Sequence, residues 1–418
     1  MKRLLWNAVL VTALLVFALA PPQAAVADGD SLYELIGKRL ELMQVVAAHK
    51  WHHGLPIEDL EREALVIEQA AADALRHGLR VDASRAFFAA QIDAAKEIQA
   101  YWHGVWQQGS GPAAAADLDT QVRPELLRLG AEILAAARRN GTSVGASAGP
   151  TAALEVVGMS ASTAAALAMA ARDLQPYAHR LQQILHSGVL RVGTTGDYPP
   201  FSYRGDADAH YQGVDIDLAR DLAAALDVAV EFVPTSWPTL LDDLVAGHYD
   251  IGMSGISRTL ARQRLGYQSL PYFADGKTPI ARCDAAARLG SLADIDRPGV
   301  RVVVNPGGTN EAFVDANIRQ ADKLLHPDNR TIFQLLLEGA ADVMITDRVE
   351  VGLQTALHPA LCATMSDNLS YHDKAYLMPQ DDPWRAFVDT WLALARGSGV
   401  VADALQRHGV QPNPPRGP

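Results

Sequence analysis

The chain has 418 residues, of which 49% are hydrophobic and only 20% are charged. At about 100–200 residues per domain, this length predicts two or three globular units. A mean hydropathy near zero excludes a mainly disordered chain. The formal charge is −12, from 36 Lys and Arg against 48 Asp and Glu, so no broad positive field is available for nucleic acid. Any anionic ligand must therefore be bound by a local group of basic residues.

Residues 1–27 have the pattern of a secretory signal peptide. Lys2 and Arg3 precede an apolar run at 4–20, and an Ala-x-Ala cleavage pattern ends at Ala27. The pattern predicts export to the periplasm, with an uncleaved N-terminal anchor as the alternative. No later stretch is long and apolar enough to hold the mature protein in a membrane.

The sequence contains two cysteines, Cys283 and Cys362. Export would expose them to an oxidising compartment, where an even count in one region favours a disulfide. Two free buried thiols remain the alternative, because spacing alone does not show that the Cα atoms come within reach.

Composition divides the mature chain into two parts. Residues 28–186 are rich in helix formers, with turn signals at 54–56, 109–112 and 141–150. From Val189 onward, short β-branched runs alternate with helical stretches such as 215–226. The predicted strands lie at 189–192, 228–233, 250–253, 300–304 and 342–345. We therefore predict a multidomain protein, all-α and then α/β, with a Pro-rich disordered tail at 412–418.

Polar residues in the helical part recur at helical spacing. Arg39 and Lys50 are eleven positions apart without an intervening proline, so one helix would point both cations the same way, toward a dianion. Gln91, Ala95 and Gln99 recur every four residues as one stripe. Taken one at a time, each polar residue is better explained as solvated surface.

The ordered set changes this interpretation. The string Lys38-Arg39-Leu40, the segment 46–51, the segment 55–59 with Arg62, and Val122-Arg123-Pro124 together resemble the secreted, all-helical chorismate mutases, over residues 28–186. The resemblance implies that the carboxylates of chorismate bind to Arg39, Arg62 and Arg123. It implies that Lys50 and Gln99 form hydrogen bonds to the ether oxygen of chorismate. It also implies that Asp59 and Glu63 contact the hydroxyl and neighbouring groups.

The chemistry explains these residue types. Chorismate rearranges to prephenate through a pericyclic transition state in which negative charge gathers on the ether oxygen, so positioned cations and amide donors suffice. No nucleophile, base or cofactor is needed. His49 and His53 have the spacing of two zinc ligands, but a third ligand is missing. We therefore expect no metal there.

The α/β part carries a ligand-facing pattern. A strand leads into the aromatic-rich loop at 197–203, and the segments 213–219, 236–237 and 250–257 follow, with Arg262 after them. This order resembles the periplasmic solute-binding proteins for amino acids and organic acids, whose two lobes close on a ligand. The lobes are expected at 187–278 with 371–411, and at 279–370. Arg262 would bind a ligand carboxylate, and the other residues expected at the ligand are Asp197, Tyr198, Phe201, Trp237 and Ser254.

A narrower resemblance rests on the strings at 234–238, 275–279, 305–311 and 346–350. Over about 185–409 they are similar to the periplasmic cyclohexadienyl dehydratases, which convert prephenate to phenylpyruvate and arogenate to phenylalanine. The positions of both cysteines match that family, which supports their pairing. The resemblance also implies that carboxylates or the hydroxyl are oriented by Asn305, Thr309 and Asn310, with Lys277 as a charge partner and Asp347 near the ammonium of arogenate.

The resemblance implies that Glu350 lies in the pocket, which makes it the expected proton donor. Prephenate loses CO₂ and its ring hydroxyl together, so the reaction needs mainly a proton for the departing hydroxide. Apolar walls such as Trp237 and Tyr198 are expected to raise the pKa of Glu350 and keep it protonated near neutral pH. The alternative is an ordinary solvated glutamate at a helix start.

The product of the first expected reaction is the substrate of the second. We therefore predict an exported bifunctional enzyme for small-molecule substrates, without cofactor or metal; whether it forms a homo-oligomer stays open. One alternative is a two-lobed receptor for an aromatic or amino-acid ligand with a helical domain in front. Another keeps the mutase and makes the α/β part a sensor of its product.

Overall fold

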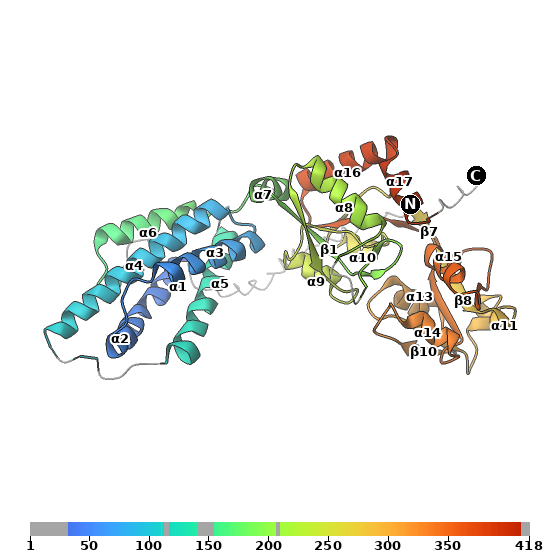
Figure 1. The fold of residues 1–418 in the computed structure, drawn as a ribbon, viewed down its shortest axis with the longest axis horizontal. Coiled ribbons are helices and arrows are strands. Elements are labelled where there is room, and N and C mark those ends of the chain that lie inside the picture. Colours follow the sequence, from blue (N-terminus) through green and yellow to red (C-terminus); the bar gives the residue numbers. More distant parts are fainter. Residues whose placement is uncertain (1–31, 110, 113–116, 141–153, 206–209, 411–418) are drawn as a thin grey trace, which may run out of the picture.

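Two parts of different architecture follow one another along the chain (Figure 1). The structure is a computed structural model that describes residues 32–109, 111–112, 117–140, 154–205 and 210–410. The predicted signal peptide, the turn at 141–150 and the tail at 412–418 lie outside the described residues. None of the described helices has the length and apolar character needed to cross a membrane.

The first part is all-helical, as predicted. Its core joins Ile36 and Leu40 to Phe87, Ile98 and Ile133 of later helices. The helices are α1 (Leu32–Glu41), α2 (Met43–His53), α3 (Leu60–Arg76), α4 (Val81–Gln107), the π-helical turn η1 (Leu118–Val122), α5 (Arg123–Asn140) and α6 (Ala161–Asp173).

The prediction of one helix carrying both Arg39 and Lys50 is wrong. Helices α1 and α2 are separated by the single residue Leu42, whose φ of −64° and ψ of −15° are still helical and whose carbonyl accepts from the backbone of Val46 at 3.1 Å. The two helices have different main neighbours, since α1 lies mainly along α5 and α2 along α4.

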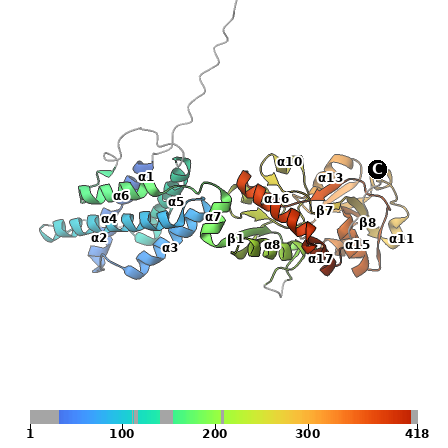
Figure 2. The same cartoon turned by 90° about the horizontal axis from the view of Figure 1, so that it is seen from above.

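Helix α7 (Arg180–Ser187) joins the two parts (Figure 2). The side chain of Gln183 donates to the carbonyl of Leu75 at the end of α3, at 2.7 Å. Arg180 forms a buried ion pair with Asp250 at 3.0 Å, and Arg191 shares that carboxylate at 2.6 Å. The junction is thus tied to both parts.

The second part contains two five-stranded sheets, one in each lobe. Lobe 1 has the order β4 (Ala229–Pro234), β1 (Val189–Thr194), β5 (Ile251–Gly252), β14 (Leu377–Met378) and β6 (Tyr267–Gln268). Its helices are α8 (Val214–Ala225), α9 (Leu240–Val245), α10 (Leu260–Gln263), α16 (Asp382–Gly397) and α17 (Val400–Arg407). Strand β1 pairs in parallel with β4 and β5, which is typical of α/β lobes.

Lobe 2 has the order β10 (Asp322–Leu325), β9 (Arg301–Val304), β11 (Val343–Asp347), β8 (Lys277–Arg282) and β12 (Leu361–Ala363). Its helices are α11 (Cys283–Ala286), α12 (Leu292–Ile295), α13 (Thr309–Asn317), α14 (Ile332–Leu337) and α15 (Arg348–Leu357). Cys283 and Cys362 form a disulfide with a Cα–Cα distance of 4.8 Å. All five predicted strands are present, with shifts of one or two residues at their ends.

The chain passes between the lobes through a two-stranded antiparallel ribbon. Strand β7 (Phe273–Asp275) runs into β8 through Gly276, and β13 (His372–Lys374) returns beside it, with Asp275 opposite His372. A side chain at Gly276 would meet the carbonyl of Ser370 at 2.1 Å, so only glycine fits between the strands. A separate short hairpin joins β2 (Asp197–Tyr198) and β3 (Ser202–Tyr203).

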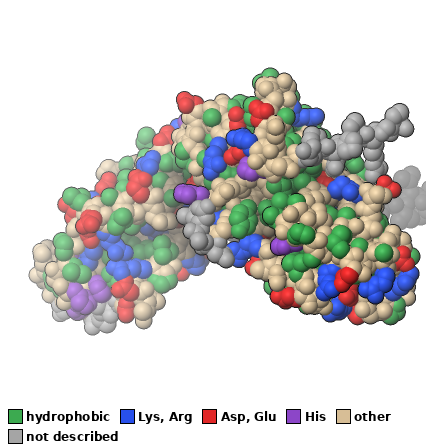
Figure 3. Space-filling view, turned by 45° about the vertical axis from the view of Figure 1, so that its right-hand side comes forward, with side chains coloured by type: hydrophobic (Ala, Val, Ile, Leu, Met, Phe, Trp, Pro, Cys, Tyr) green, Lys and Arg blue, Asp and Glu red, His purple; other side chains and the backbone are tan. Residues whose placement is uncertain are grey.

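Charges of both signs are interspersed over the face seen in Figure 3. No single-sign field covers that face, which agrees with the argument from composition. Basic residues that act on a ligand must be sought in the cavities.

Candidate active sites

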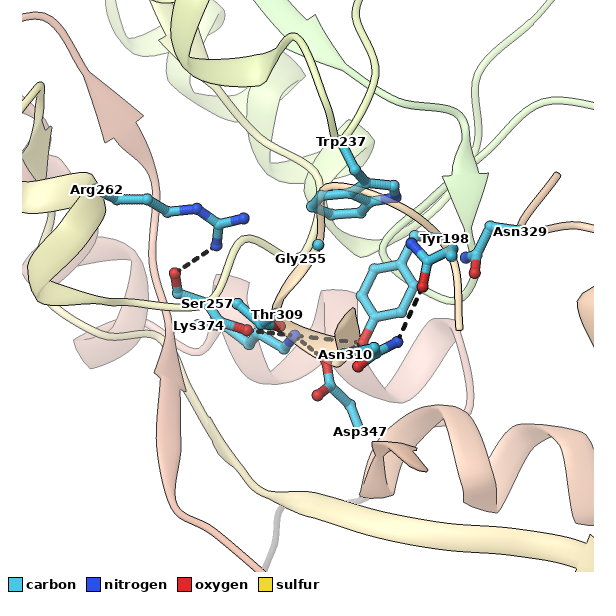
Figure 4. A pocket seen from close by; sticks show the side chains of 12 residues that line it. Tyr198, Trp237, Gly255, Ser257, Arg262, Thr309, Asn310, Asn329, Asp347 and Lys374 are labelled. Atoms are coloured by element: carbon cyan, nitrogen blue, oxygen red, sulfur yellow. Dashed lines mark hydrogen bonds and ion pairs between the residues drawn. The ribbon is translucent and has the colours of Figure 1, made fainter. Parts of the chain in front are cut away.

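A small cavity lies between the two lobes (Figure 4). Its volume is about 20 Å³, enough for roughly one water molecule. A substrate therefore does not fit into this cavity as it stands in the structure. The cavity is lined by Tyr198, Trp237, Gly255, Ser257, Arg262, Asn305, Gly308, Thr309, Asn310, Asn329, Asp347 and Lys374.

The carboxyl ends of parallel strands bring several of these residues together. Asn305 follows the last residue of β9, and Asp347 is the last residue of β11. Ligands of open α/β sheets bind at this edge because loops there can vary without disturbing the sheet. Gly307 approaches Pro238 of lobe 1 so closely that a Cβ would meet its Cα at 2.6 Å.

Asp347 is the centre of a buried charge network. Its carboxylate lies 2.6 Å from Lys277 Nζ, 2.5 Å from Lys374 Nζ and 3.2 Å from His372 Nε2. The hydroxyl of Tyr198 also donates to it. Burial alone would raise the pKa of Asp347, but the two lysines and His372 lower that pKa well below its ordinary range. Asp347 is thus a firmly ionised carboxylate.

A chain of amides and hydroxyls extends from Lys277. Its ammonium donates to Thr309 Oγ1 at 2.9 Å and to the side-chain oxygen of Asn310. The Asn310 amide in turn donates to Asn305 at 3.2 Å and to Thr346 Oγ1 at 3.1 Å. The three predicted polar residues Asn305, Thr309 and Asn310 are therefore in one network.

Glu350 lies in the first turn of α15 and is 1% exposed. Thr346 donates a hydrogen bond to its carboxyl group. Burial raises the pKa of Glu350 to about 8, and the neighbouring charge of Asp347 acts in the same direction. The solvated-glutamate alternative is therefore wrong, because the carboxyl group is buried.

Arg262 and Trp237 lie on the lobe 1 side. The Arg262 guanidinium donates to the carbonyl of Ser257 at 2.7 Å, and burial lowers its pKa to about 10. It stays protonated at neutral pH. The Trp237 indole meets the ring of Tyr198 edge-on, with centroids 5.7 Å apart.

Five of the predicted ligand or catalytic residues do not border the closed cavity. The Asp197 carboxylate accepts from the Trp237 indole at 3.1 Å, Phe201 packs against Tyr198, and Ser254 bonds Thr195 at 2.8 Å. These three support the cavity wall. The other two are Lys277, which touches the cavity residues Thr309, Asn310 and Asp347, and Glu350, which is joined to them through Thr346.

Other residues of the site were missed from the sequence. Ser257, Asn329 and Lys374 line the cavity, and His372 and Asp275 lie beside Asp347. Asn329 spans the lobes by donating to the carbonyl of Asp197 at 2.9 Å. The signal in the sequence for Lys374 is its place directly before the apolar run Ala375-Tyr376-Leu377-Met378.

A second cavity, of about 340 Å³, lies in the helical part. This is within the size range of small-molecule sites. It has two arginines on its wall and many apolar side chains; its lining residues are Arg39, Arg62, Leu65, Val66, Gln69, Ala70, Asp73, Phe88, Leu126, Leu127, Gly130, Ala131 and Leu134.

Buried polar atoms beside this cavity lack protein partners. Arg39 donates to Gln91, and burial lowers the pKa of Arg39 to about 10. Among the described residues, no hydrogen-bond partner exists for Arg39 Nε, Gln91 Nε2 or Gln99 Oε1. Such atoms are costly unless something else satisfies them, so they favour a polar ligand.

Lys50 lies near the start of α3 and donates to the carbonyl of Ile57 at 2.6 Å. Burial lowers its pKa, and the nearby charges of Asp59 and Glu63 oppose this effect. Asp59 caps α3 by accepting from the backbone of Arg62 at 3.1 Å. Glu63 accepts from the backbone of Asp59 and from Lys96, each at 3.1 Å. Both acids therefore already have protein partners.

Arg123 does not line the second cavity with Arg39 and Arg62, the other two arginines predicted to bind chorismate. It begins α5, is 40% exposed in its side chain and pairs with Asp119 of η1. Gln99 is buried and donates to the carbonyl of Ala95 at 3.0 Å, beside Met43. It does not border the cavity.

Two groups could suggest a metal. His49 and His53 stack with ring centroids 4.1 Å apart instead of converging on one point. Asp275, Asp347 and His372 lie close together, but the ammonium groups of Lys277 and Lys374 occupy the Asp347 carboxylate. Neither group is suited to a cation.

Different protein families match the two parts of the chain. A family model for bacterial extracellular solute-binding proteins, family 3, matches residues 190–411. One for chorismate mutase type II matches residues 29–100.

Individual relatives agree with this division. Cyclohexadienyl dehydratase of Pseudomonas aeruginosa is 49% identical over 239 residues, 57% of this chain and 89% of that protein. A monofunctional chorismate mutase of Enterobacter agglomerans is 31% identical over 106 residues, 25% of this chain and 59% of that protein. The structure of an ancestral amino acid-binding protein, a precursor of cyclohexadienyl dehydratase, is 33% identical with a TM-score of 0.52, and the match covers 55% of this chain and 98% of that one.

Proposed function

The chain belongs to the family 3 bacterial extracellular solute-binding proteins, with a chorismate mutase type II segment in front, and from this we propose that it is a bifunctional enzyme. The helical part, residues 28–186, rearranges chorismate to prephenate. The α/β part, residues 187–411, converts prephenate to phenylpyruvate, or arogenate to phenylalanine. The 49% identity to a cyclohexadienyl dehydratase supports the second activity.

The dehydratase step needs one proton at one atom. The bond between the ring and its carboxylate breaks, its electron pair completes the aromatic ring, and hydroxide leaves from the opposite carbon. Glu350 protonates that hydroxide, so water and CO₂ are formed and the carboxyl group is left ionised until it takes up a proton from solvent. Arg262 and Lys374, which line the cavity, hold the carboxylates of the substrate, and Lys277 acts behind them through Thr309, Asn310 and Asp347.

The buried Glu350 carboxyl group carries this proposal. A binding protein has no use for a buried acid without an ion-pair partner, and an acid with a pKa of about 8 is costly to keep unless it acts. Asn305, Thr309 and Asn310 orient the substrate through the network that starts at Lys277.

The mutase step uses the second cavity. Arg39 and Arg62 bind the carboxylates of chorismate, because both line the cavity and Arg39 Nε has no hydrogen-bond partner within the described part of the chain. Lys50 and Gln99 do not line this cavity, so they would stabilise the ether oxygen only after the substrate displaces their present contacts with Ile57 and Ala95. Arg123, Asp59 and Glu63 would reach the substrate only after η1 and the start of α3 rearrange.

The proposal locates both reactions in the periplasm. Residues 1–27 would direct export and be removed, and the solute-binding family is typical of that compartment. The disulfide is consistent with an oxidising environment.

Glu350→Gln tests the proposal. The variant should lose phenylpyruvate formation from prephenate by about 100-fold or more, because a side-chain amide cannot supply the proton. It should still bind prephenate, measured by calorimetry. Glu338→Gln, at an exposed glutamate of the same lobe, is the matched control and should be fully active. A wild-type protein that binds prephenate without forming phenylpyruvate would instead be a receptor or sensor.

A further inference from the structure

The helical part and lobe 1 meet at the carboxyl end of α3. The last carbonyl groups of a helix have no partners within the helix, so they need partners elsewhere. The carbonyl of Leu75 accepts a hydrogen bond at 2.7 Å from the side chain of Gln183, a buried residue of α7. Gly247, in the loop after α9, lies so close to Arg76 that an added Cβ would meet the Arg76 carbonyl oxygen at 2.9 Å. Helix α3 therefore ends against two elements of the α/β part.

The segment 174–179, which connects α6 to α7, is held by the helical part. Its backbone pairs with the turn between α3 and α4. The N–H of Arg80 donates to the carbonyl of Gln175 at 3.0 Å, and the N–H of Tyr177 donates to the carbonyl of Gly78 at 2.9 Å. The connection is therefore packed into the helical part up to the start of α7.

Helix α7 itself belongs to lobe 1. Its residue Ile184 is fully buried in the core of that lobe, together with Trp384 of α16. The N–H of Arg180 donates to the carboxylate of Asp381 at 2.6 Å, and the Arg180 guanidinium pairs with Asp250 at 3.0 Å. The same short helix thus joins the core of lobe 1 and contacts the end of α3, as its place between the two parts in Figures 1 and 2 shows.

Helix α3 also forms much of the wall of the second cavity. Six of the described residues that line this cavity lie on α3, namely Arg62, Leu65, Val66, Gln69, Ala70 and Asp73. Asp73 lies two positions before Leu75, so the cavity wall reaches to within one helical turn of the contact with lobe 1. A displacement of this end of α3 would move the wall. In enzymes, a displacement of about 1 Å can cost about 100-fold in rate.

We propose that lobe 1 is a structural partner of the mutase, because its contacts with the end of α3 hold the wall of the chorismate cavity in place. The contact surface consists of Gln183 and Gly247, and both act as positioning residues. Neither is among the described residues that line either cavity. The inference rests on the proposed mutase function and adds that this activity depends on a surface of the α/β part.

A matched pair of glycines tests the proposal on the full-length protein. Gly247 and Gly399 both lie in lobe 1 with positive φ, 75° and 91°, so alanine strains the backbone at either position. At Gly247 the new Cβ would press on α3, whereas at Gly399 nothing in the described chain lies within 4 Å of it. Gly247→Ala should lower kcat/KM for chorismate by about tenfold or more, and Gly399→Ala should leave it unchanged. Wild-type values in both variants, or an equal loss in both, would overturn the proposal.

Amide hydrogen exchange gives a second readout that needs neither activity nor a strained backbone. Gln183→Leu removes the donor to Leu75, and the control Gln334→Leu removes an exposed contact with Glu338 in lobe 2. Exchange in peptides covering 70–81 should be about fivefold faster in Gln183→Leu and unchanged in the control, as expected for one lost hydrogen bond. Unchanged exchange in Gln183→Leu would overturn the proposal. A wild type without mutase activity would reject the proposed function, while the exchange result would still decide whether lobe 1 supports α3.

Discussion

Glu350 and Asp347 are separated by three positions, yet their protonation differs because their neighbours differ. Two ammonium groups hold Asp347 ionised, whereas Glu350 has a threonine hydroxyl as its hydrogen-bond partner and no ion pair among the described residues. Burial without a counter-charge raises the pKa of a carboxyl group, and paired cations lower it. One acid can therefore donate a proton while the other orients cations.

The pH dependence of the dehydratase follows from Glu350. Its protonated form is the donor and its pKa is raised to about 8, so kcat/KM for prephenate should fall as pH rises through about 8. The fall should approach tenfold for each further pH unit. Rates measured from about pH 6 to about pH 9 check this. A rate that climbs over that range would mean that the ionised form acts, contrary to the proposed role.

Arg39 permits a matching test in the helical part. Arg39→Ala should lower prephenate formation from chorismate by about 100-fold or more, because it removes a charge-assisted contact and leaves Gln91 without its partner. Dehydration of supplied prephenate should stay at the wild-type rate. Arg85→Ala, which removes an exposed ion pair with Glu68 away from the cavity lining, is the control. If both activities fell in Arg39→Ala, the assignment of separate sites would be contradicted.

At the scale of elements, strands were easier to predict than the geometry of the sites. Short β-branched runs between helices mark the strands, because both faces of a parallel sheet are buried. The interruption at Leu42 could not be predicted, since no Pro or Gly stands there and Leu42 keeps helical dihedral angles. Lys374 was missed for a similar reason. Its cavity position depends on the pairing of β13 with β7, about one hundred residues earlier.

The disulfide of lobe 2 gives a prediction at this scale. It joins the start of α11 to the edge strand β12 across a sequence separation of 79 residues. Its reduction should lower the unfolding free energy of the α/β part by about 4 kcal/mol, since the unfolded chain gains loop freedom. Denaturant unfolding with and without reductant measures this. The mutase rate is an internal control because the helical part has no cysteine. Unchanged stability after complete reduction would contradict the prediction.

At the scale of the whole molecule, each part has its own core and its own cavity. The parts meet around α7, where Gln183 bonds Leu75 and the carbonyl of Arg76 packs against Gly247 (Figures 1 and 2). The two cavities share no lining residue. Prephenate must therefore leave one site to reach the other.

Two variants that each lack one activity should together carry out both reactions when they are mixed. A mixture of Arg39→Ala and Glu350→Gln should convert chorismate to phenylpyruvate, because prephenate made by the second protein can diffuse to the first. Each variant alone should not complete the sequence. Failure of the mixture, with each remaining activity intact, would mean that prephenate does not exchange with solvent.

The most direct test of the account is a time course with chorismate and the wild-type mature protein, in which chorismate, prephenate and phenylpyruvate are followed together. The account predicts that chorismate disappears, prephenate rises and then falls, and phenylpyruvate accumulates without any added cofactor. Prephenate that accumulates without phenylpyruvate would reduce the α/β part to a binding protein. Chorismate that persists while supplied prephenate is dehydrated would contradict the mutase assignment.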